Sequence, residues 1–312
     1  MSVLVFVETV EGIPTGPSLV ALTASRPLGV LQAVVTGDVD LALLGAYGVQ
    51  FAHRIDLDEY APQAWGAAVA QVATDIDAKM VIAPSTARGN EVLAHAAVDL
   101  DQPFAANCLT YDQDTGNVLR IRWGGSLYED AVLEGSPAIL SFSQFAVEES
   151  AAGQPASTTM IEGNVSISDE AMVVTIVDQE QAAEGVTLAT ARLVVSGGRG
   201  VGSAEGFAIL DELAGMLGGK VGCSRVVTNN GWRPHADQVG QTGTVVAPDL
   251  YIACGISGAI QHWVGMMASK TVLAINTDPD APMMTKADYA VIGDVHEVVP
   301  AIVEEIRARS AG

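Results

Sequence analysis

Basic residues are scarce in this sequence of 312 residues, which has 15 Lys and Arg against 37 Asp and Glu and a formal net charge of −22. A surface of that sign repels a phosphate backbone, so binding to DNA or RNA is not expected. The acidity has two interpretations. It serves solubility or adaptation to salt, or it forms a surface that steers basic partners.

Cysteines are equally few. Cys108, Cys223 and Cys254 lie far apart and form no CxxC pair, which argues against a structural zinc site or an iron–sulfur cluster. Their odd number favours a reducing compartment. No apolar stretch approaches the roughly 20 residues that span a bilayer, and residues 2–7 have the pattern of a first strand rather than of a signal peptide. The expectation is a cytoplasmic protein without direct membrane insertion.

Common catalytic signatures are also missing. The sequence has no nucleophile elbow with a Ser-His-Asp order, no carboxylate pair in a hydrolase context, no HExxH motif and no P-loop. No catalytic side chain and no metal ligand is therefore predicted.

Hydrophobic residues make up 49% of the chain, which is ample for ordinary cores, and the length suggests two domains on a prior of ~150 residues each. Strands and helices alternate in the first part, which is typical of βαβ units and predicts an α/β fold with a mostly parallel sheet. The expected strands lie at residues 3–7, 31–35 and 80–83, the helices at 18–23, 41–46, 62–76 and 91–98, and a loop at 84–90, and the run ends at 105–110.

The pattern changes to strands and turns between residues 117 and 158 and then alternates again. We place the domain boundary in a polar connection, which gives an N-terminal domain of residues 1–185 and a C-terminal domain of residues 186–312. Strands are expected at residues 118–123, 131–133, 138–142, 173–177, 193–195, 251–253, 271–275 and 289–292, helices at 205–217 and 295–309, and an exposed loop at 148–155.

Four polar motifs follow short apolar runs in the last third of the chain. They are VSGGRG at residues 195–200, VGQTG at 239–243, CGISGAIQH at 254–262 and AINTD at 274–278. Glycines, hydroxyls and amides at the carboxyl ends of strands can hold a large phosphorylated aromatic ligand at one edge of a sheet. A single nucleotide or flavin cofactor would explain all four motifs.

The first motif also has a plain structural interpretation. The glycines of residues 197–202 resemble a dinucleotide fingerprint, but Ser203 stands where the third glycine belongs. The run is either a tight strand-to-helix turn or a phosphate cradle, in which Arg199 would pair with a pyrophosphate oxygen.

The remaining motifs leave similar alternatives. Ser257 either caps a helix or opens an anion site at a helix N-terminus. Residues 239–243 are either a hairpin turn or a loop that approaches a ligand closely. His262 is either a packed core residue or a ligand contact, and Arg225, in a chain with little Arg, is more consistent with a placed residue than with a scattered surface one.

Together these runs resemble the alpha subunit of electron transfer flavoprotein, the FixB-type family. The pieces VSGGRG, QVGQTG, APDLYIA, GISGAIQH and AINTDPDAP occur in the family's order and spacing across residues 193–300. Residues 1–180 match by their alternating pattern and by pieces such as GAYG at 45–48. The resemblance implies an N-terminal Rossmann-like domain of the adenine-nucleotide-hydrolase type and a doubly wound, FAD-binding C-terminal domain.

The resemblance further implies FAD as the cofactor and a heterodimer with a beta subunit, which we expect the N-terminal domain to dock. The family shuttles electrons from flavin dehydrogenases, such as the acyl-CoA dehydrogenases of fatty acid beta-oxidation, to a quinone oxidoreductase or a similar acceptor. The chain itself would be a redox carrier rather than an enzyme with its own substrate.

The family's cofactor-binding residues are carried over position by position. Arg199 would lie near the flavin and its phosphates, and Ser224 and Arg225 would contact the ring system. The other positions are Val239, Gly240, Gln241 and Thr242 along the ring; Ser257, Gly258, Ala259, Ile260, Gln261 and His262 along the ribityl–pyrophosphate, with His262 on the ring's O2 side; and Asn276 and Asp294 at the adenosine end, with Val295 beside them.

The resemblance assigns redox tuning to Arg225, Thr242 and His262, with the Thr242 hydroxyl reaching the N5 edge of the ring. Reduction places negative charge on the N1–C2=O locus, so a cation and a donor there raise the first reduction potential. One charge-assisted hydrogen bond of ~1.5–3 kcal/mol is sufficient, because a tenfold shift corresponds to ~1.4 kcal/mol.

Two other functions remain as alternatives. A stand-alone nucleotide-dependent enzyme with a deoxyhypusine-synthase-like cofactor domain would need a catalytic Lys, and Lys220, Lys270 and Lys286 lie outside the motifs. A regulatory nucleotide-binding module on residues 1–150 would need a phosphate loop near residues 81–90. Against the family pattern, the run WRPH at residues 232–235 is unusually basic and aromatic, and no ferredoxin-like extension is expected.

Overall fold

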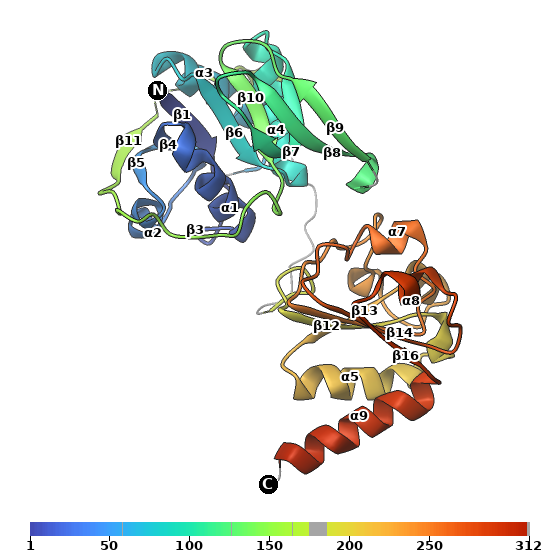
Figure 1. Cartoon of the computed structure of the whole chain (residues 1–312). Coiled ribbons are helices and arrows are strands. Elements are labelled where there is room, and N and C mark those ends of the chain that lie inside the picture. Colours follow the sequence, from blue (N-terminus) through green and yellow to red (C-terminus); the bar gives the residue numbers. More distant parts are fainter. Residues whose placement is uncertain (58, 126, 164, 175–185, 311–312) are drawn as a thin grey trace. The chain divides into compact units, whose positions relative to one another are not determined.

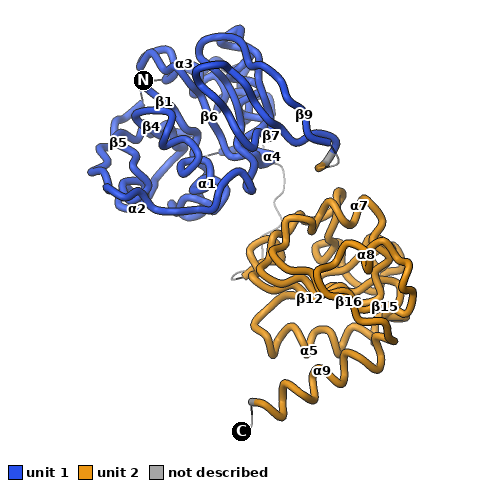
Figure 2. Tube along the Cα trace, in the orientation of Figure 1, with its two compact units in different colours: residues 1–123, 127–180 blue, residues 124–126, 181–312 orange. Residues whose placement is uncertain are grey.

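The computed structural model describes residues 1–57, 59–125, 127–163, 165–174 and 186–310. The chain divides into two compact units, one of residues 1–123 and 127–180 and the other of residues 124–126 and 181–312 (Figures 1 and 2). Each unit has its own sheet and its own hydrophobic cores. The expected boundary after residue 185 adjoins residues 175–185, which lie outside the described ranges, so its exact position stays a prediction.

The first unit is built on a nine-stranded sheet with the order β11-β5-β4-β1-β6-β10-β7-β8-β9. Neighbouring strands are parallel from β11 to β7, and the pairs β7–β8 and β8–β9 are antiparallel. The strands are β1 (Ser2–Phe6), β4 (Val30–Thr36), β5 (Val49–Ile55), β6 (Met80–Pro84), β7 (Phe104–Tyr111), β8 (Asn117–Arg122), β9 (Leu127–Val132), β10 (Ala138–Phe142) and β11 (Thr159–Glu162), with a small hairpin of β2 (Thr9–Val10) and β3 (Ile13–Pro14).

Alternating side chains of the central strands fill two cores, one on each face of this sheet. Val3 and Val5 of β1 belong to one core, and Leu4 and Phe6 belong to the other. A parallel sheet covered on both faces needs strands that are apolar on both sides, which explains the continuous apolar runs in the sequence. The covering helices are α1 (Gly16–Ser25) and α2 (Leu41–Ala46) on the first face and α3 (Pro62–Asp75) and α4 (Ala87–Asp99) on the second.

Some local expectations were wrong. The stretch predicted as a loop at residues 84–90 contains the start of α4, because Thr86 Oγ1 accepts a hydrogen bond from Gly89 N at 2.8 Å and caps the helix. The strand expected from residue 173 is not formed by Val173 and Val174, which are 71% and 48% exposed. Apolar β-branched residues form no strand where no partner strand lies beside them. Residues 175–177 of that prediction lie outside the described ranges.

The second unit is a five-stranded parallel sheet with the order β13-β12-β14-β15-β16. Helices α5 and α9 cover one face, and α7, α8 and adjacent loops cover the other (Figure 1). This confirms the predicted α/β class and the doubly wound C-terminal domain. The elements are β12 (Leu193–Gly197), α5 (Ala208–Met216), β13 (Lys220–Cys223), α6 (Arg225–Asn229), β14 (Leu250–Cys254), α7 (Ile260–Trp263), β15 (Val272–Asn276), α8 (Pro282–Lys286), β16 (Tyr289–Ile292) and α9 (Val295–Ser310).

The order of strands reverses at β12. The chain passes from β12 to β13 on one side of it and then returns to place β14 on the other side. The loops that follow β12 and β14 therefore leave the sheet in opposite directions, and a crevice forms between them at the carboxyl edge. Ligands of doubly wound sheets bind at such a switch point.

Candidate functional site

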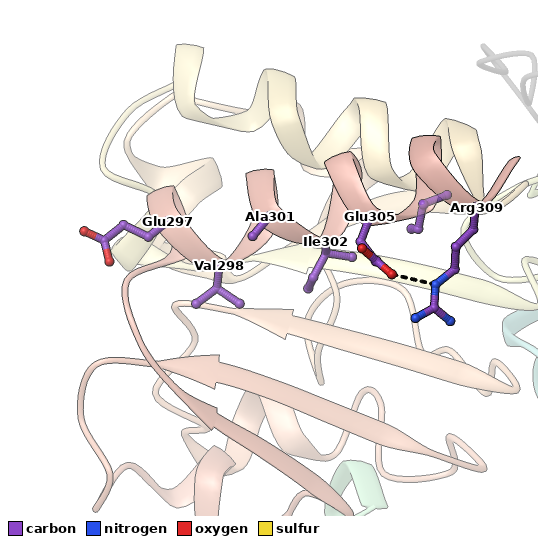
Figure 3. A pocket seen from close by; sticks show the side chains of 7 residues that line it. Glu297, Val298, Ala301, Ile302, Glu305 and Arg309 are labelled. Atoms are coloured by element: carbon purple, nitrogen blue, oxygen red, sulfur yellow. Dashed lines mark hydrogen bonds and ion pairs between the residues drawn. The ribbon is translucent and has the colours of Figure 1, made fainter. Parts of the chain in front are cut away.

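Two hollows in the second unit differ in their lining. One runs along α9 and is lined by Glu297, Val298, Ala301, Ile302, Glu305, Ile306 and Arg309, with Arg309 Nε bonded to Glu305 Oε1 at 2.7 Å (Figure 3). It contains none of the predicted cofactor residues. The other opens at the carboxyl ends of the strands and contains many of them.

This second hollow is a cleft of about 490 Å³, within the range of about 300–1,000 Å³ that ligand sites span. Segments from four strand ends meet in it, so three of the four sequence motifs share one site. The lining residues are Arg199 and Gly200 after β12; Ser224, Arg225 and Val226 after β13; Gly255, Ile256, Ser257, Gly258, Ala259, Gln261 and His262 after β14; and Asn276, Asp278 and Ala281 at the end of β15 and beyond it.

The loops after β12 and β14 are joined backbone to backbone. Gly198 N donates to Cys254 O at 2.9 Å, and Gly200 N donates to Gly255 O at 3.1 Å. A Cβ on Gly198 would lie 2.4 Å from Gly255 O, and a Cβ on Gly255 would lie 2.7 Å from Gly200 Cα. Gly255 also has a φ of +62°, which favours glycine. The glycine spacing is thus explained by a contact between two loops at the floor of the cleft.

Two guanidinium groups lie at the cleft. Arg199 and Arg225 are exposed, and within the described residues neither forms an ion pair. In the same unit, Arg192 and Arg233 do pair with carboxylates. The cleft contains a single carboxylate among its described lining residues, Asp278. In a chain of net charge −22, this local balance favours an anionic ligand such as a pyrophosphate.

Ser224 presents a hydroxyl without a partner. It precedes α6 with extended backbone angles (φ −81°, ψ 158°), yet its side chain does not cap that helix. Its Oγ is buried and has no hydrogen-bond partner within the part of the chain that the structure describes. A buried polar atom left unpaired costs about 1–3 kcal/mol, and this one belongs to a residue that lines the cleft. The contact of Ser224 with a ligand stays a prediction.

His262 lies at the same floor, with 6% of its surface exposed. Its Nε2 is 2.9 Å from the hydroxyl of Tyr251, and its Nδ1 is buried without a hydrogen-bond partner among the described residues. Burial lowers the pKa of His262 to about 4, and the nearby backbone of Val239 acts more weakly in the opposite direction. The imidazole is therefore neutral at pH 7. The histidine is thus buried and also lines the cleft, and its contact with a ligand stays a prediction.

The predicted ring-lining segment, residues 239–242, lies outside the cleft's lining. It is attached to one lining residue, since Gln241 N donates to Gln261 O at 2.7 Å. The Thr242 hydroxyl accepts a hydrogen bond from Gln238 Nε2 at 3.0 Å. The segment thus lies beside the α7 loop, and its contact with a ligand stays a prediction.

Only some of the residues predicted to hold the adenosine end line the cleft. Asn276 lines the cleft, whereas Asp294 and Val295 do not. Asp294 Oδ1 accepts a hydrogen bond from His296 N at 2.9 Å at the start of α9, and Val295 is 3% exposed in the core. Gly293 N donates to Asn276 O at 3.0 Å, so the residue before Asp294 adjoins the cleft through Asn276. The roles of Asp294 and Val295 stay predictions.

The cleft also includes residues that were not predicted as ligand contacts. The added residues that belong to the sequence motifs could have been recognised, because the motifs follow predicted strands. Nothing in the sequence pattern marked Val226 or Ala281 as a residue of the cleft. Ile260, which was predicted, is 62% exposed and outside the lining. The residues added by the structure are Gly200, Val226, Gly255, Ile256, Asp278 and Ala281.

The unusual run at residues 232–235 has a structural role. Arg233 Nη1 lies 2.9 Å from Asp211 Oδ2, and its Nε lies 2.8 Å from Asp237 Oδ2. Its guanidinium also lies over the ring of Phe207, 5.6 Å from the centroid. These contacts fix the loop to the start of α5, and the run contributes no residue to the cleft.

Within the described ranges, no group of three or more His, Cys, Asp or Glu side chains could hold a metal ion. Every helix in those ranges is too short or too polar to cross a membrane. The cysteines Cys108, Cys223 and Cys254 are buried and free, and burial raises the pKa of each thiol to about 12. None of them is therefore a reactive thiolate at neutral pH.

The glycine contact between the two loops leads to a prediction. Gly255→Ala is expected to weaken binding of FAD, the ligand implied by the resemblance, by at least about tenfold, because its Cβ separates the loops. Gly218→Ala is the matched control, since Gly218 has a similar φ of +68° but nothing within 4 Å of a Cβ. The control should lose stability of about 1–2 kcal/mol and retain its affinity. Fluorescence titration with FAD and urea unfolding measure the two effects, and equal loss of affinity in both variants would contradict the prediction.

Comparisons with known proteins identify the family of the chain. Residues 3–168 match the family model of the electron transfer flavoprotein domain, and residues 187–267 match that of the electron transfer flavoprotein FAD-binding domain. The chain is 35% identical over 317 residues to electron transfer flavoprotein subunit alpha of Mycobacterium leprae, covering 98% of each chain. It is 35% identical over 322 residues to the protein FixB of Clostridium saccharobutylicum, covering 98% of this chain and 96% of that one.

A third relative, electron transfer flavoprotein subunit alpha of Bacillus subtilis, is 36% identical over 270 residues, which cover 86% of this chain and 83% of the relative. The C-terminal unit, which contains the cleft, is thus an FAD-binding domain. On these matches, the chain belongs to the electron transfer flavoprotein alpha subunit family.

Proposed function

We propose that FAD lies in the cleft at the switch point of the second sheet and that the chain carries electrons there as part of a heterodimer with a beta subunit. Electrons would arrive from flavin dehydrogenases, such as acyl-CoA dehydrogenases, and pass to a quinone oxidoreductase or a similar acceptor. The observation that carries this proposal is that Arg199 and Arg225 lie at one cleft and form no ion pair among the described residues. Ser224 and His262 line the same cleft, and each has a buried polar atom with no hydrogen-bond partner in that part of the chain. When bound, the flavin supplies the electron-accepting group.

The phosphate end of the cofactor fits the loops after β12 and β14. Arg199 offers a guanidinium that can pair bidentately with pyrophosphate oxygens. The segment from Ser257 to Gln261 leads into α7 and offers backbone groups and small side chains. Asn276 marks the direction of the adenosine end, along the carboxyl edge toward Asp294.

The ring end fits the loop after β13 and the floor below it. Arg225 would hold a positive charge beside the isoalloxazine, and Ser224 and His262 would donate hydrogen bonds to it. A cation placed where negative charge develops favours the reduced ring. These residues therefore bind and orient the ring and set how readily it accepts an electron.

The rival enzyme function finds no support in this cleft. Among the described residues, Lys270 Nζ lies 3.1 Å from Asp249 Oδ1, and Lys286 lies over the ring of Trp263. No lysine is among the described residues that line the cleft. A deoxyhypusine-synthase-like reaction would thus lack its catalytic amine here.

The beta subunit is proposed to dock on the first unit, and β9 offers an apolar edge for it. Tyr128 and Val132 of this edge strand are 58% and 59% exposed, and Trp123 at the hairpin is 76% exposed. Exposed apolar edges of this kind invite pairing or packing with another chain. The three buried, free thiols are consistent with a reducing, cytoplasmic setting.

The central test is the cofactor itself. The purified complex is expected to be yellow and to release one FAD per alpha chain on denaturation, because the sequence contains no motif for covalent attachment of a flavin. The released flavin is identified by chromatography and its visible spectrum. A colourless complex, or release of FMN, would argue against the proposal.

Arg225→Ala is expected to lower the first one-electron reduction potential, by about 59 mV for each tenfold change in the equilibrium, while FAD stays bound through Arg199 and the α7 loop. Arg225→Lys should restore part of the difference, because an ammonium does not stack on a planar ring as a guanidinium does. Lys220→Ala, at an exposed lysine outside the cleft, is the control. Redox titration at fixed ionic strength measures the effect, and identical potentials in all variants would remove the role assigned to Arg225.

Tyr128→Asp and Val132→Asp in β9 are expected to weaken binding of the beta subunit by at least about tenfold, since a buried unpaired charge is costly. Val98→Asp is the control, because Val98 is 78% exposed and belongs to α4 rather than to β9. Calorimetric titration with the purified beta subunit gives the affinities. Wild-type affinity in both β9 variants would place the docking surface elsewhere.

A further inference from the structure

The cleft has its cations and its carboxylate at different ends. Arg225 follows β13, Arg199 follows β12, and Asp278 follows β15. The strand order is β13-β12-β14-β15, so the loop of Asp278 leaves the sheet two strand spacings from the loop of Arg199, or about 10 Å away. Asp278 is the one acidic residue in the described lining. The cleft therefore has a basic end and an acidic end.

The carboxylate of Asp278 is held in place by its own loop. Its Oδ1 accepts a hydrogen bond from Asp280 N at 3.0 Å, and Asp278 N donates to Asn276 Oδ1 at 3.1 Å. Asn276 Nδ2 in turn donates to Ile256 O at 3.1 Å, in the loop after β14. The amide of Asn276 thus joins the loop after β15 to the neighbouring loop and fixes the backbone of Asp278 at the cleft.

The second oxygen of this carboxylate is available to a ligand. Asp278 is exposed, and its Oδ2 accepts no hydrogen bond from the described residues. An ionised carboxylate can accept hydrogen bonds but cannot donate them, so the ligand group beside it must be a donor. A phosphate would be repelled there by the like charge. The acidic end therefore fits a neutral group that carries a hydroxyl or amino hydrogen.

The order of the loops indicates which part of FAD reaches this end. The proposed function places the ring at the loop after β13 and the pyrophosphate at the loop after β12. In FAD the adenosine follows the pyrophosphate on the side away from the ring, which is the direction of β15 along the sheet. Its ribose carries two adjacent hydroxyls, and acidic residues accept hydrogen bonds from such hydroxyls in other dinucleotide-binding sheets.

We propose that Asp278 is a specificity-determining residue of the cleft, which accepts hydrogen bonds from the ribose hydroxyls in the adenosine half of FAD, and that Asn276 positions it. The inference rests on the proposed function, because it takes FAD as the ligand of this cleft. Its consequence is selectivity: the cleft favours a ribose with free hydroxyls. If Asp278 were a solvated turn residue instead, its charge would only weaken the binding of an anion.

The test compares two ligands of the complex with the beta subunit after its FAD has been removed. One is FAD, and the other is an analogue whose adenosine is replaced by 2′,3′-dideoxyadenosine. Wild type is expected to bind FAD at least about tenfold more tightly than the analogue, because a hydrogen bond to a charged group is among the stronger ones. Asp278→Ala should bind both ligands with similar affinity. Fluorescence titration gives the ratio within each protein, which cancels general effects on the loop.

Two further variants make the test specific. Asp280→Ala is the matched control, because Asp280 is an exposed acidic residue of the same loop and lies outside the lining of the cleft. It should keep the full preference for FAD. Asp278→Asn keeps an oxygen that can accept from Asp280 N and should also reduce the preference, so the test remains decisive if Asp278→Ala does not fold.

Equal affinities of wild type for the two ligands would overturn the inference. So would a full preference for FAD in a folded Asp278→Ala and in Asp278→Asn, or a preference lost in Asp280→Ala. Tighter binding of FAD by Asp278→Ala would show that the carboxylate only repels the ligand, and would also overturn it. Failure of the proposed function is a different result, namely a wild-type complex that binds neither ligand.

Discussion

The contact between the backbones that follow β12 and β14 is the constraint on which the cleft depends. Gly198 and Gly200 donate hydrogen bonds to the carbonyls of Cys254 and Gly255, at a distance that leaves no room for side chains. The two loops are thereby held at the point where the order of strands reverses. Arg199 and the α7 loop both start from this junction, so the positions of a cation and of a histidine depend on the same few glycines.

The charged groups of the cleft lie at its rim, and the neutral polar groups lie at its floor. Arg199 and Arg225 are exposed, where water supports their charge until a ligand arrives, whereas His262 and Ser224 have buried polar atoms without charge. Burying an unpaired cation would cost far more than burying a neutral donor. The fold therefore places the charged groups at the exposed rim, and burial keeps the imidazole neutral, because it lowers the pKa of His262 to about 4.

The sheets of the two units are covered in the same way but differ at their edges. Both sheets are covered by helices on two faces, as parallel strands require. The first sheet continues into an antiparallel hairpin, and its last strand, β9, leaves Tyr128 and Val132 exposed. The chain as a whole is acidic, whereas this edge strand exposes apolar side chains. Such a local apolar patch favours binding of a protein partner over nonspecific association.

Much of the fold could be predicted from the sequence, because its signals are local. Apolar runs such as those of β1, β6 and β14 specify buried strands, and the motifs after them identify the carboxyl edge. Strands β5 and β11 could not be found in this way, since the four residues of β11 form a strand only by pairing with β5. The start of α4 depends on one cap, the Thr86 hydroxyl that accepts a hydrogen bond from Gly89 N. Serine and threonine after a proline also favour a turn, so the sequence alone did not place this start.

The sequence by itself determined the residue types of the site: two arginines, a histidine, a serine and the glycines that let backbones approach. Only the tertiary structure decided which of them meet. It bonded Gln241 to Gln261 of the cleft, added Val226 and Ala281 to the lining, and paired Tyr251 with His262. The reason is physical: a residue's type sets what it can bind, but its partners are set by strand order and loop packing, which arise from contacts distant in sequence.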